Sequence, residues 1–311
     1  MSFKLFTVFT PTHNRAHLLK RLYHSLLKQT EKDFKWLVID DGSCDDTKEV
    51  ITGFINEGII DIEYHFIEKG FLYKAMKKSA ELAESKYIIR IDDDDELTEN
   101  CLEVFKSEWD KIESEGIDDI GEIRALSILD DGMICGNYQP QIGQSPIDTN
   151  YIERHLNNKA RLENIACRKV SIWKQLFYDD DKWLFEKVNF VLDTIYWYRL
   201  SRLCRSRYIF VGLRLYHETM GSLVKTFNKL TIQNLYNIVF SNYILLNDNT
   251  DLFWKNPLYF IKILYKYAIY GFRLNLDYCK LFKTLKSNWL RILFVLFTPI
   301  FYMKSRNIKL S

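Results

Sequence analysis

The sequence predicts an α/β fold: a mixed, mainly parallel sheet flanked by helices, followed by a helical C-terminal extension. In the first 115 residues, short β-rich apolar runs alternate with amphipathic stretches of helical period. This alternation is typical of parallel sheets with right-handed crossovers. Beyond residue 226 the chain becomes apolar, aromatic and helical in its spacing. At 311 residues the chain is long enough for one large domain or two smaller ones.

The first 115 residues are expected to contain four strands, each followed by a helix. The strands are predicted from apolar and β-branched runs, and the helices from apolar residues that recur at three- and four-residue spacing. The expected strands are Phe3–Thr10, Phe34–Ile39, Ile59–Ile67 and Tyr87–Ile91. The expected helices are Arg15–Lys28, 46–56, Phe71–Ala83 and one that begins after an N-cap at Thr98.

From residue 116 to the C-terminal extension the pattern is less regular. The expected strands are Gly121–Leu129, Met133–Gly136 and Tyr208–Tyr216, and the expected helices are 151–176 and 186–203. On this basis we divide the chain into a domain of residues 1–225, with halves 1–115 and 116–225, and a helical region of residues 226–311.

The C-terminal end differs from the rest of the chain in charge. Residues 252–311 contain eleven Lys and Arg residues and one acid, Asp277, whereas the whole chain has a net charge of only +2. None of the apolar runs in this region reaches the ~20 residues that a membrane span needs. Basic, aromatic, amphipathic helices are typical of the surface of an anionic membrane. A helical subdomain packed on the preceding domain is the alternative.

The six cysteines are scattered, and none belongs to a C-x-x-C pair. This pattern argues against a zinc site or a disulfide framework and is typical of a reducing cytosol. The apolar run Phe3–Phe9 is too short for a signal peptide, so we interpret it as the first strand. With 47% hydrophobic and 27% charged residues, the composition is that of a globular protein and excludes extensive disorder.

Four consecutive aspartates, Asp92–Asp95, follow the apolar run that ends at Ile91. Neighbouring carboxylates disfavour each other's ionisation, and a cation bound between them removes this cost. Carboxylate oxygens suit hard ions such as Mg²⁺ or Mn²⁺. A solvated acidic turn is the alternative interpretation. The position at a strand end favours a binding site, because open α/β sheets bind ligands at the carboxyl ends of their strands.

Two other polar clusters also follow predicted strands: Pro11–Arg15 and Asp40–Ser43. The carboxyl ends of parallel strands meet at one edge of the sheet, so we expect both clusters to converge with Asp92–Asp95. Turn formation and helix capping are the alternative explanation for Asp40-Asp41.

These clusters carry a family resemblance. Three segments together resemble the nucleotide-sugar-binding domain of family 2 glycosyltransferases of the bacterial polysaccharide type. In chain order they are Thr10-Pro11-Thr12-His13-Asn14-Arg15, Val38-Ile39-Asp40-Asp41-Gly42-Ser43 and Ile91-Asp92-Asp93-Asp94-Asp95. The members are inverting, metal-dependent enzymes with the GT-A fold. A further set resembles the family's acceptor-side helix and closing segment: Phe185-Glu186, Phe190, Asp193, Trp197, Tyr216 and Gly221-Ser222-Leu223. The likeness covers roughly residues 3–225.

The resemblance implies a role for each matched residue. Asp92 is expected to contact the ribose and Asp94 the metal ion, Mn²⁺ or Mg²⁺, with Asp95 as a supporting acid or second ligand. Asp41 is expected to accept a hydrogen bond from the base. The other residues expected to bind the nucleotide-sugar are Pro11, Thr12, Asn14 and Lys74.

Two positions depart from the family pattern. Leu72 occupies the usual place of a lysine near the diphosphate, so Lys69 or Lys74 is expected to replace it. Asp93 stands where the family more often has a small residue. Neither change removes an expected metal ligand.

An inverting transfer also needs a general base, which removes the proton of the attacking hydroxyl. The resemblance places this base at Asp193, with Glu186 as the alternative. Asp193 lies among apolar residues, and burial would raise its pKa towards a useful value. An exposed helix acid without a catalytic role is the other interpretation.

The resemblance therefore implies transfer of a sugar from a nucleotide diphospho-sugar, expected to be a UDP-sugar, to a glycan or lipid-linked acceptor in surface or capsular polysaccharide biosynthesis. We expect a cytoplasmic protein at the inner face of the cell membrane, in peripheral contact with anionic lipid, and no nucleic-acid partner. One alternative is a sugar nucleotidyltransferase, although Pro11–Arg15 lacks the glycines usual in that class. Another is a catalytically silent scaffold that binds membrane or a protein partner.

Overall fold

The computed structural model describes residues 3–68, 71–137, 139–157, 162–177, 188, 193–217 and 231–306, and only the backbone of residues 71, 155–157 and 193–194. The chain divides into two compact units. Unit 1 comprises Met1–Phe177 and Leu200–Thr219, and unit 2 comprises Tyr178–Arg199 and Met220–Ser311. The boundary expected at residues 225 and 226 lies outside the described residues.

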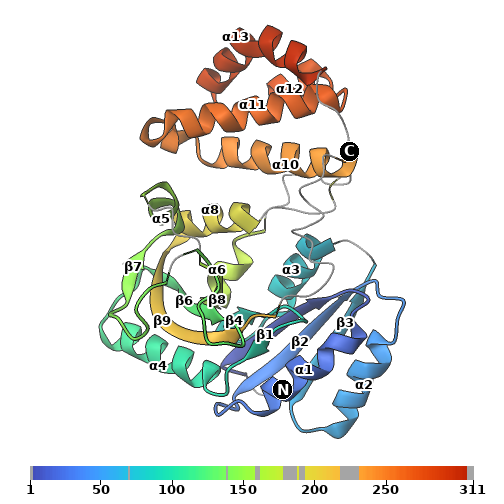
Figure 1. Cartoon of the computed structure of the whole chain (residues 1–311), viewed down its shortest axis with the longest axis vertical. Helices are drawn as coiled ribbons and strands as arrows, with labels where there is room; N and C mark the ends of the chain where they lie inside the picture. Colours follow the sequence, from blue (N-terminus) through green and yellow to red (C-terminus); the bar gives the residue numbers. More distant parts are fainter. Residues whose placement is uncertain are drawn as a thin grey trace. The chain divides into compact units, whose positions relative to one another are not determined.

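Unit 1 is built on a mixed sheet with the strand order β3-β2-β1-β4-β8-β6-β9-β5, and β7 also pairs with β9 (Figure 1). Neighbouring strands from β3 to β4 are parallel, whereas β8 is antiparallel to both β4 and β6. The predicted α/β class is therefore confirmed. The strands are β1 (Phe6–Thr12), β2 (Phe34–Asp41), β3 (Asp61–Ile67), β4 (Tyr87–Arg90), β5 (Glu96–Leu97), β6 (Ile120–Ile128), β7 (Ile147–Thr149), β8 (Asn164–Lys169) and β9 (Arg205–Leu215).

Helices cover both faces of this sheet (Figure 1). Apolar residues of α1, α2 and α4 share one core with alternate residues of the strands, including Phe6, Val8 and Trp36. Helices α3 and α6 pack on the opposite face, where the Trp173 indole N–H donates to Ser79 Oγ at 3.0 Å. The helices of unit 1 are α1 (Ala16–Leu27), α2 (Thr47–Glu57), α3 (Phe71–Leu82), α4 (Cys101–Ser114), α5 (Tyr151–Asn157) and α6 (Val170–Lys174), and α8 (Asp193–Leu203) crosses the division between the units.

The alternation of strands and helices predicted for the first 115 residues is confirmed. Three other predictions are wrong: one of a helix, one of a strand and one of an N-cap. The expected helix 151–176 is instead α5, β8 and α6. The short apolar segment of β8 is compatible with a helix or a strand, and pairing with β4 and β6 makes it a strand. Met133–Gly136 forms only isolated bridges, not a strand. The N-cap of α4 is Asn100, not Thr98.

Unit 2 contains the predicted C-terminal helices. Helix α11 packs against both α10 and α13. Three of its described helices begin with a side-chain cap that sequence rules favour: Thr231 Oγ1 accepts from the Asn234 N–H, Asn256 Oδ1 from the Tyr259 N–H, and Asp277 Oδ2 from the Lys280 N–H. Among the described residues, no helix is both long and apolar enough to cross a bilayer. The elements are α10 (Ile232–Asp248), the 3₁₀ helix η1 (Thr250–Lys255), α11 (Pro257–Arg273), α12 (Tyr278–Thr284) and α13 (Asn288–Ser305).

Two glycines allow a matched test of this packing. A Cβ on Gly121, in β6, would lie 2.7 Å from Cys204 Cβ, whereas a Cβ on Gly53, in α2, would meet nothing within 4 Å. We expect Gly121→Ala to lower the free energy of unfolding by about 1–3 kcal/mol through overpacking. Gly53→Ala is expected to raise it by up to about 1 kcal/mol because alanine favours a helix. Urea denaturation followed by circular dichroism measures both, and equal effects would contradict the packing of β6 against Cys204.

Candidate active site

The polar loops that follow β1, β2 and β4 converge, as the sequence predicts. Thr12 Oγ1, at the end of β1, donates to Asp93 Oδ2 at 2.8 Å. Asn14, which has a left-handed φ of 54°, joins the loops after β1 and β2. Its N–H donates to Ser43 Oγ at 2.8 Å, and its Oδ1 accepts from the Cys44 N–H at 2.7 Å. Asn14 therefore has a clear structural role in holding the two loops together.

The four aspartates form a turn that separates them into two pairs. The Asp95 N–H donates to the Asp92 carbonyl at 3.2 Å and closes the turn. The side chains of Asp93 and Asp95 are only 4% and 1% exposed, whereas those of Asp92 and Asp94 are 38% and 16% exposed. The more accessible carboxylates are thus those of Asp92 and Asp94, and the two between and after them are buried.

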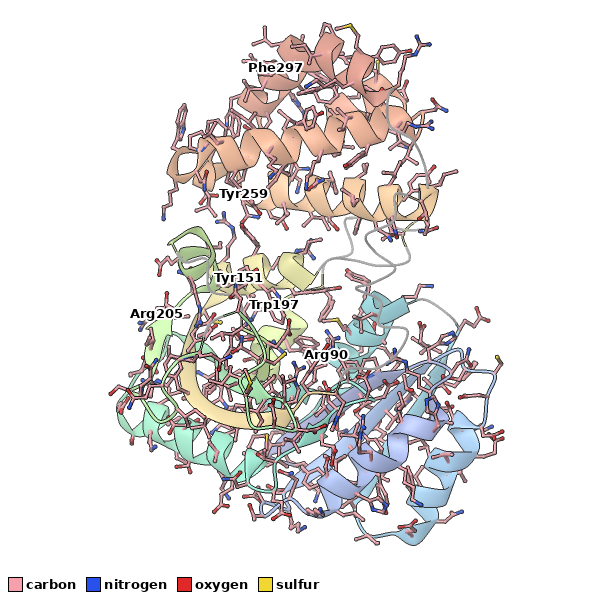
Figure 2. All side chains as sticks on the ribbon, in the orientation of Figure 1. Arg90, Tyr151, Trp197, Arg205, Tyr259 and Phe297 are labelled. Carbon is pink, nitrogen blue, oxygen red and sulfur yellow. The ribbon has the colours of Figure 1, made fainter. Side chains whose placement is uncertain are left out.

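Two arginines form ion pairs with the first three carboxylates. Arg15 Nη1 lies 2.9 Å from Asp93 Oδ1 and 3.0 Å from Asp94 Oδ2. Arg90, at the end of β4 (Figure 2), lies 2.8 Å from Asp92 Oδ1. Desolvation opposes the charge of Asp92, but Arg90 holds the pKa of this carboxyl below its usual value.

The fourth carboxylate is held by β9 and the residues that follow it. Arg214 Nη1 lies 3.4 Å from Asp95 Oδ2, and Arg214 Nε donates to Ser127 Oγ at 2.7 Å. The His217 N–H donates to Asp95 Oδ1 at 3.1 Å, while His217 Nε2 lies 2.9 Å from Glu96 Oε1. Asp95 therefore connects the aspartate run to the last strand of unit 1.

Burial sets the protonation of the two inward carboxyls. Burial raises the pKa of Asp95 to about 7 despite the opposing charge of Arg214. Burial also raises the pKa of Asp93 to about 6, although Arg15 and the Thr12 hydroxyl both favour the ionised form. These shifts are typical of carboxyls that serve inside a site rather than on a solvated turn.

The donor set fits a hard divalent ion. Asp94 and Asp92 offer accessible carboxylate oxygens, the ligands that Mg²⁺ and Mn²⁺ prefer. Within the described part of the chain, no group of three His, Cys, Asp or Glu side chains forms a metal site by itself. Mg²⁺ is commonly bound by one or two carboxylates together with phosphate oxygens of the substrate, so two accessible carboxylates are compatible with such a site.

The other residues predicted to bind the nucleotide-sugar lie on nearby elements of unit 1. Asp41 is the last residue of β2 and is buried, with 6% of its surface exposed. Pro11 lies beside Thr12 near the end of β1 and is partly buried. Lys74 is exposed in the first turn of α3, and Leu72 on the same turn is partly buried. Lys69 lies outside the described residues.

The acceptor-side residues are only partly described. Asp193 is the first residue of α8, but its side chain lies outside the described part of the structure. Trp197 lies on the same helix and is partly buried (Figure 2). Tyr216 follows β9, and its ring centroid is 5.4 Å from the Arg214 guanidinium carbon. The other predicted positions lie outside the described residues: Phe185, Glu186, Phe190 and Gly221-Ser222-Leu223.

Three arginines of the site were not predicted from the sequence. Arg15 belongs to the polar cluster Pro11–Arg15, which was expected to converge with the aspartates, and Arg90 lies two residues before Asp92, so both positions carried a usable signal. Arg214 lies more than a hundred residues from the run and has no local signal. It reaches Asp95 only because β5 pairs with β9.

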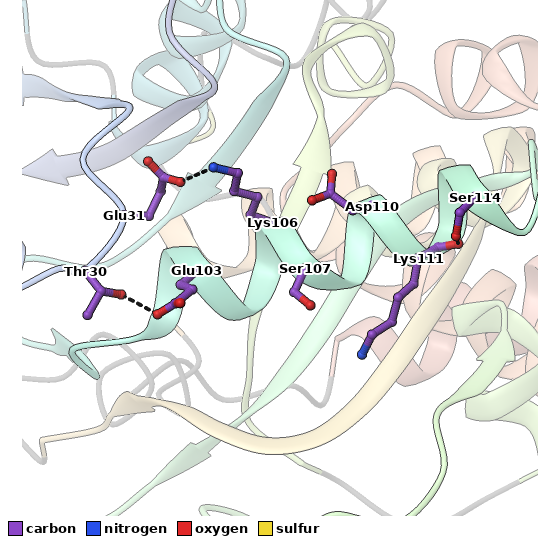
Figure 3. Close-up of a pocket in the computed structure, with 8 residues that line it drawn as sticks. All are labelled: Thr30, Glu31, Glu103, Lys106, Ser107, Asp110, Lys111 and Ser114. Atoms are coloured by element: carbon purple, nitrogen blue, oxygen red, sulfur yellow. Dashed lines mark hydrogen bonds and ion pairs between the residues drawn. The ribbon is translucent and has the colours of Figure 1, made fainter.

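A surface groove of about 590 Å³ lies elsewhere in unit 1, along α4 (Figure 3). Its walls include ion-paired or hydrogen-bonded side chains, such as Glu31 with Lys106 and Thr30 with Glu103. None of the residues predicted for nucleotide-sugar binding lines it. The groove is therefore separate from the converging loops.

Comparisons with known proteins agree with this arrangement. The family model described as glycosyl transferase family 2 matches residues 7–122. Over 103 residues, the chain is 32% identical to the putative colanic acid biosynthesis glycosyl transferase WcaA of Escherichia coli, covering 32% of this chain and 36% of WcaA. The chain spans only about a third of the length of the curated relatives that it matches.

Two solved structures share the fold over most of the chain. Staphylococcus aureus TarS 1–349 in complex with UDP-GlcNAc has a TM-score of 0.56 at 14% identity, over 96% of this chain and 88% of that one. The mannosyltransferase PcManGT of Pyrobaculum calidifontis, in complex with GDP-Man and Mn²⁺, has a TM-score of 0.52 at 12% identity, over 99% and 83%. Residues 7–122 are therefore similar to family 2 glycosyltransferases, and the predicted GT-A fold is confirmed.

The hydrogen bond from Thr12 to Asp93 can be tested by an isosteric change. We expect Thr12→Val to lower the free energy of unfolding by about 1–3 kcal/mol, because a buried carboxyl loses a donor. Thr52→Val is the matched control, since the Thr52 hydroxyl donates to the Lys48 carbonyl on an exposed helix surface. The control is expected to change stability by less than about 0.5 kcal/mol in the same urea titration. Equal losses in both variants would contradict the role assigned to Thr12.

Proposed function

We propose that this protein is an inverting, metal-dependent glycosyltransferase. It moves a sugar from a nucleotide diphospho-sugar, a UDP-sugar, to a hydroxyl group of a glycan or lipid-linked acceptor. The observation that carries this proposal is the convergence of three loops at the ends of β1, β2 and β4, with Asp92 and Asp94 more accessible than their neighbours. The UDP-GlcNAc complex of TarS supports the choice of donor, and the likeness to WcaA supports a role in bacterial surface or capsular polysaccharide synthesis.

In this proposal the donor binds at the ends of the parallel strands. Asp41 accepts a hydrogen bond from the base, Asp92 binds the ribose, and Pro11, Thr12 and Asn14 form the wall of the pocket. Lys74 approaches the diphosphate in place of the lysine that Leu72 replaces. This arrangement follows the general rule that open α/β sheets bind nucleotides at the carboxyl ends of their strands.

Asp94 would hold the divalent ion, Mn²⁺ or Mg²⁺, and Asp95 supports it from the buried side of the turn. When bound, the ion neutralises negative charge that develops on the departing diphosphate. The Mn²⁺ in the PcManGT complex supports this assignment. Arg15 is ion-paired with Asp94, so the guanidinium must share or release this carboxylate when an ion binds.

On the acceptor side, Asp193 removes the proton from the attacking hydroxyl as that oxygen bonds to the sugar. A positioned general base of this kind contributes roughly 10²–10⁴-fold in rate. Glu186 is the alternative base. The protein contacts anionic lipid peripherally at the cytoplasmic face of the cell membrane, where a lipid-linked acceptor would be found, and the basic, aromatic character of the C-terminal helices supports this part of the proposal.

The donor site can be tested by calorimetric titration of UDP with and without Mn²⁺. We expect UDP to bind with Mn²⁺ and at least about tenfold more weakly without it, because an ion held by Asp94 would offset the negative charge of the diphosphate. Asp94→Asn should remove this metal dependence. Asp110→Asn, at an exposed position of α4, is the matched control and should bind as the unchanged protein does. Absence of UDP binding with or without the metal would refute the proposed function.

The general base can be tested separately from binding. We expect Asp193→Asn to lower sugar transfer by about 10²–10⁴-fold, because an amide cannot accept the proton, and to leave Mn²⁺-dependent UDP binding intact. Transfer would be measured as nucleotide release in a screen of UDP-sugars with a polysaccharide acceptor. If Asp193→Asn stays active and Glu186→Gln does not, the base is Glu186.

A further inference from the structure

Helix α13 of unit 2 is apolar on two opposite sides. On the inner side, Phe294 and Phe301 are 0% and 4% exposed. Their rings pack on α11, with centroids 6.4 Å from Tyr267 and 5.6 Å from Tyr265. The outer side is also apolar but faces solvent. We call this set the α13 outer stripe: Ile292 (59% exposed), Val295 (48%), Leu296 (64%), Ile300 (44%) and Met303 (64%).

The α13 outer stripe is unusual for the surface of a water-soluble domain. Its members recur at three- and four-residue spacing, so they line one face of the helix. A surface helix normally carries polar residues on this side, and contiguous exposed apolar patches mark sites of interaction with proteins or membranes. Residues 292–303 include no charged side chain, so nothing in this segment interrupts the stripe.

A second exposed apolar group lies next to the start of this helix. Trp254 and Leu258 are both 80% exposed. Trp254 packs edge-on against Phe253, with ring centroids 5.0 Å apart. The Phe253 ring is in turn 4.0 Å from that of Trp289, in the first turn of α13. Tryptophan is enriched where a protein meets the membrane–water interface.

Positive charge borders the stripe at both ends. Arg291 precedes it, and Lys304 and Arg306 follow it. Lys304 and Arg306 lie over the rings of Tyr265 and Tyr302, at 5.5 and 5.6 Å. Helix α12 adds exposed lysines at Lys280 and Lys283, and Lys286 is exposed in the segment between α12 and α13. The one acid of residues 252–311, Asp277, accepts the Lys280 N–H at the start of α12.

We propose that the α13 outer stripe inserts into the surface of an anionic lipid bilayer and lies in its plane. This inference deepens the peripheral membrane contact of the proposed function by naming the surface that makes it. The twelve residues 292–303 extend ~18 Å as a helix, well short of the ~30 Å hydrocarbon core, so the helix lies along the membrane rather than across it. The flanking lysines and arginines then reach the lipid headgroups.

The charge of this surface selects lipid over a second copy of the chain. A symmetric dimer through α13 would bring two basic surfaces together, and like charges across an interface oppose association. An anionic bilayer offers both an apolar layer for the stripe and negative headgroups for its rim. Both components of the surface are therefore matched by one partner.

The proposal is tested by flotation of the full-length protein with phosphatidylcholine vesicles, with and without phosphatidylglycerol. We expect binding to the anionic vesicles that weakens in high salt, and little binding to pure phosphatidylcholine. Leu296→Gln/Ile300→Gln should weaken binding by about tenfold or more, because two apolar side chains no longer enter the bilayer. Ile292→Gln/Met303→Gln gives a second, independent variant of the same stripe.

The matched control is Ile55→Gln/Ile59→Gln, which makes the same kind of change at exposed isoleucines of unit 1 (41% and 61% exposed). The control should bind vesicles as the unchanged protein does. Equal vesicle binding by stripe and control variants would overturn the proposal. So would a dimer in analytical ultracentrifugation without lipid that both stripe variants abolish.

Titration of UDP with Mn²⁺ on the same samples separates this proposal from the proposed function. A protein that binds UDP but not anionic vesicles refutes the membrane surface alone. A protein that binds vesicles through the stripe but does not bind UDP refutes the donor site alone. The stripe variants are expected to keep UDP binding, since none of the changed residues belongs to the converging loops.

Discussion

The arrangement of unit 1 around its site depends on the neutralisation of four adjacent carboxylates. Two like charges 4 Å apart repel by roughly 4 kcal/mol at the effective dielectric of a protein surface, so an unpaired run would oppose its own burial. Arg15, Arg90 and Arg214 reduce this cost, and they come from the loop after β1, the end of β4 and β9. The same ion pairs that stabilise the aspartate run therefore hold three distant segments of the chain together.

The two kinds of strand pairing make separate contributions to this cluster. Parallel pairing of β1, β2 and β4 brings the loops that follow them to one edge, which places Arg15 beside Asp93 and Asp94. The antiparallel part of the sheet brings the chain back, and pairing of β5 with β9 sets Arg214 against Asp95. A sheet with parallel strands alone would supply the loops but not this second side of the site.

This division also explains which features the sequence was able to predict. Local periodicity predicts the strands and helices up to α4 except the short strand β5. The convergence of Thr12, Asn14 and Asp93 follows from a general rule for parallel sheets. Strand β8 was mistaken for helix because its short apolar segment is compatible with both, and only pairing with β4 and β6 decides between them. The contact of Arg214 with Asp95 depends on a different long-range pairing, that of β5 with β9, so no local pattern indicated it.

The distribution of the aspartates has a consequence for how ligands would bind. Asp93 and Asp95 point inward, so Asp92 and Asp94 are the members of the run most accessible to a ligand. Above the raised pKa values of Asp93 and Asp95, where all four carboxylates are ionised, the three arginines leave the cluster with one formal negative charge, which by itself repels a diphosphate. A divalent ion at Asp94 would reverse the sign of this charge and attract the same group. In the proposed function, metal and nucleotide-sugar binding are therefore coupled by electrostatics, even though two accessible carboxylates alone make an incomplete metal site.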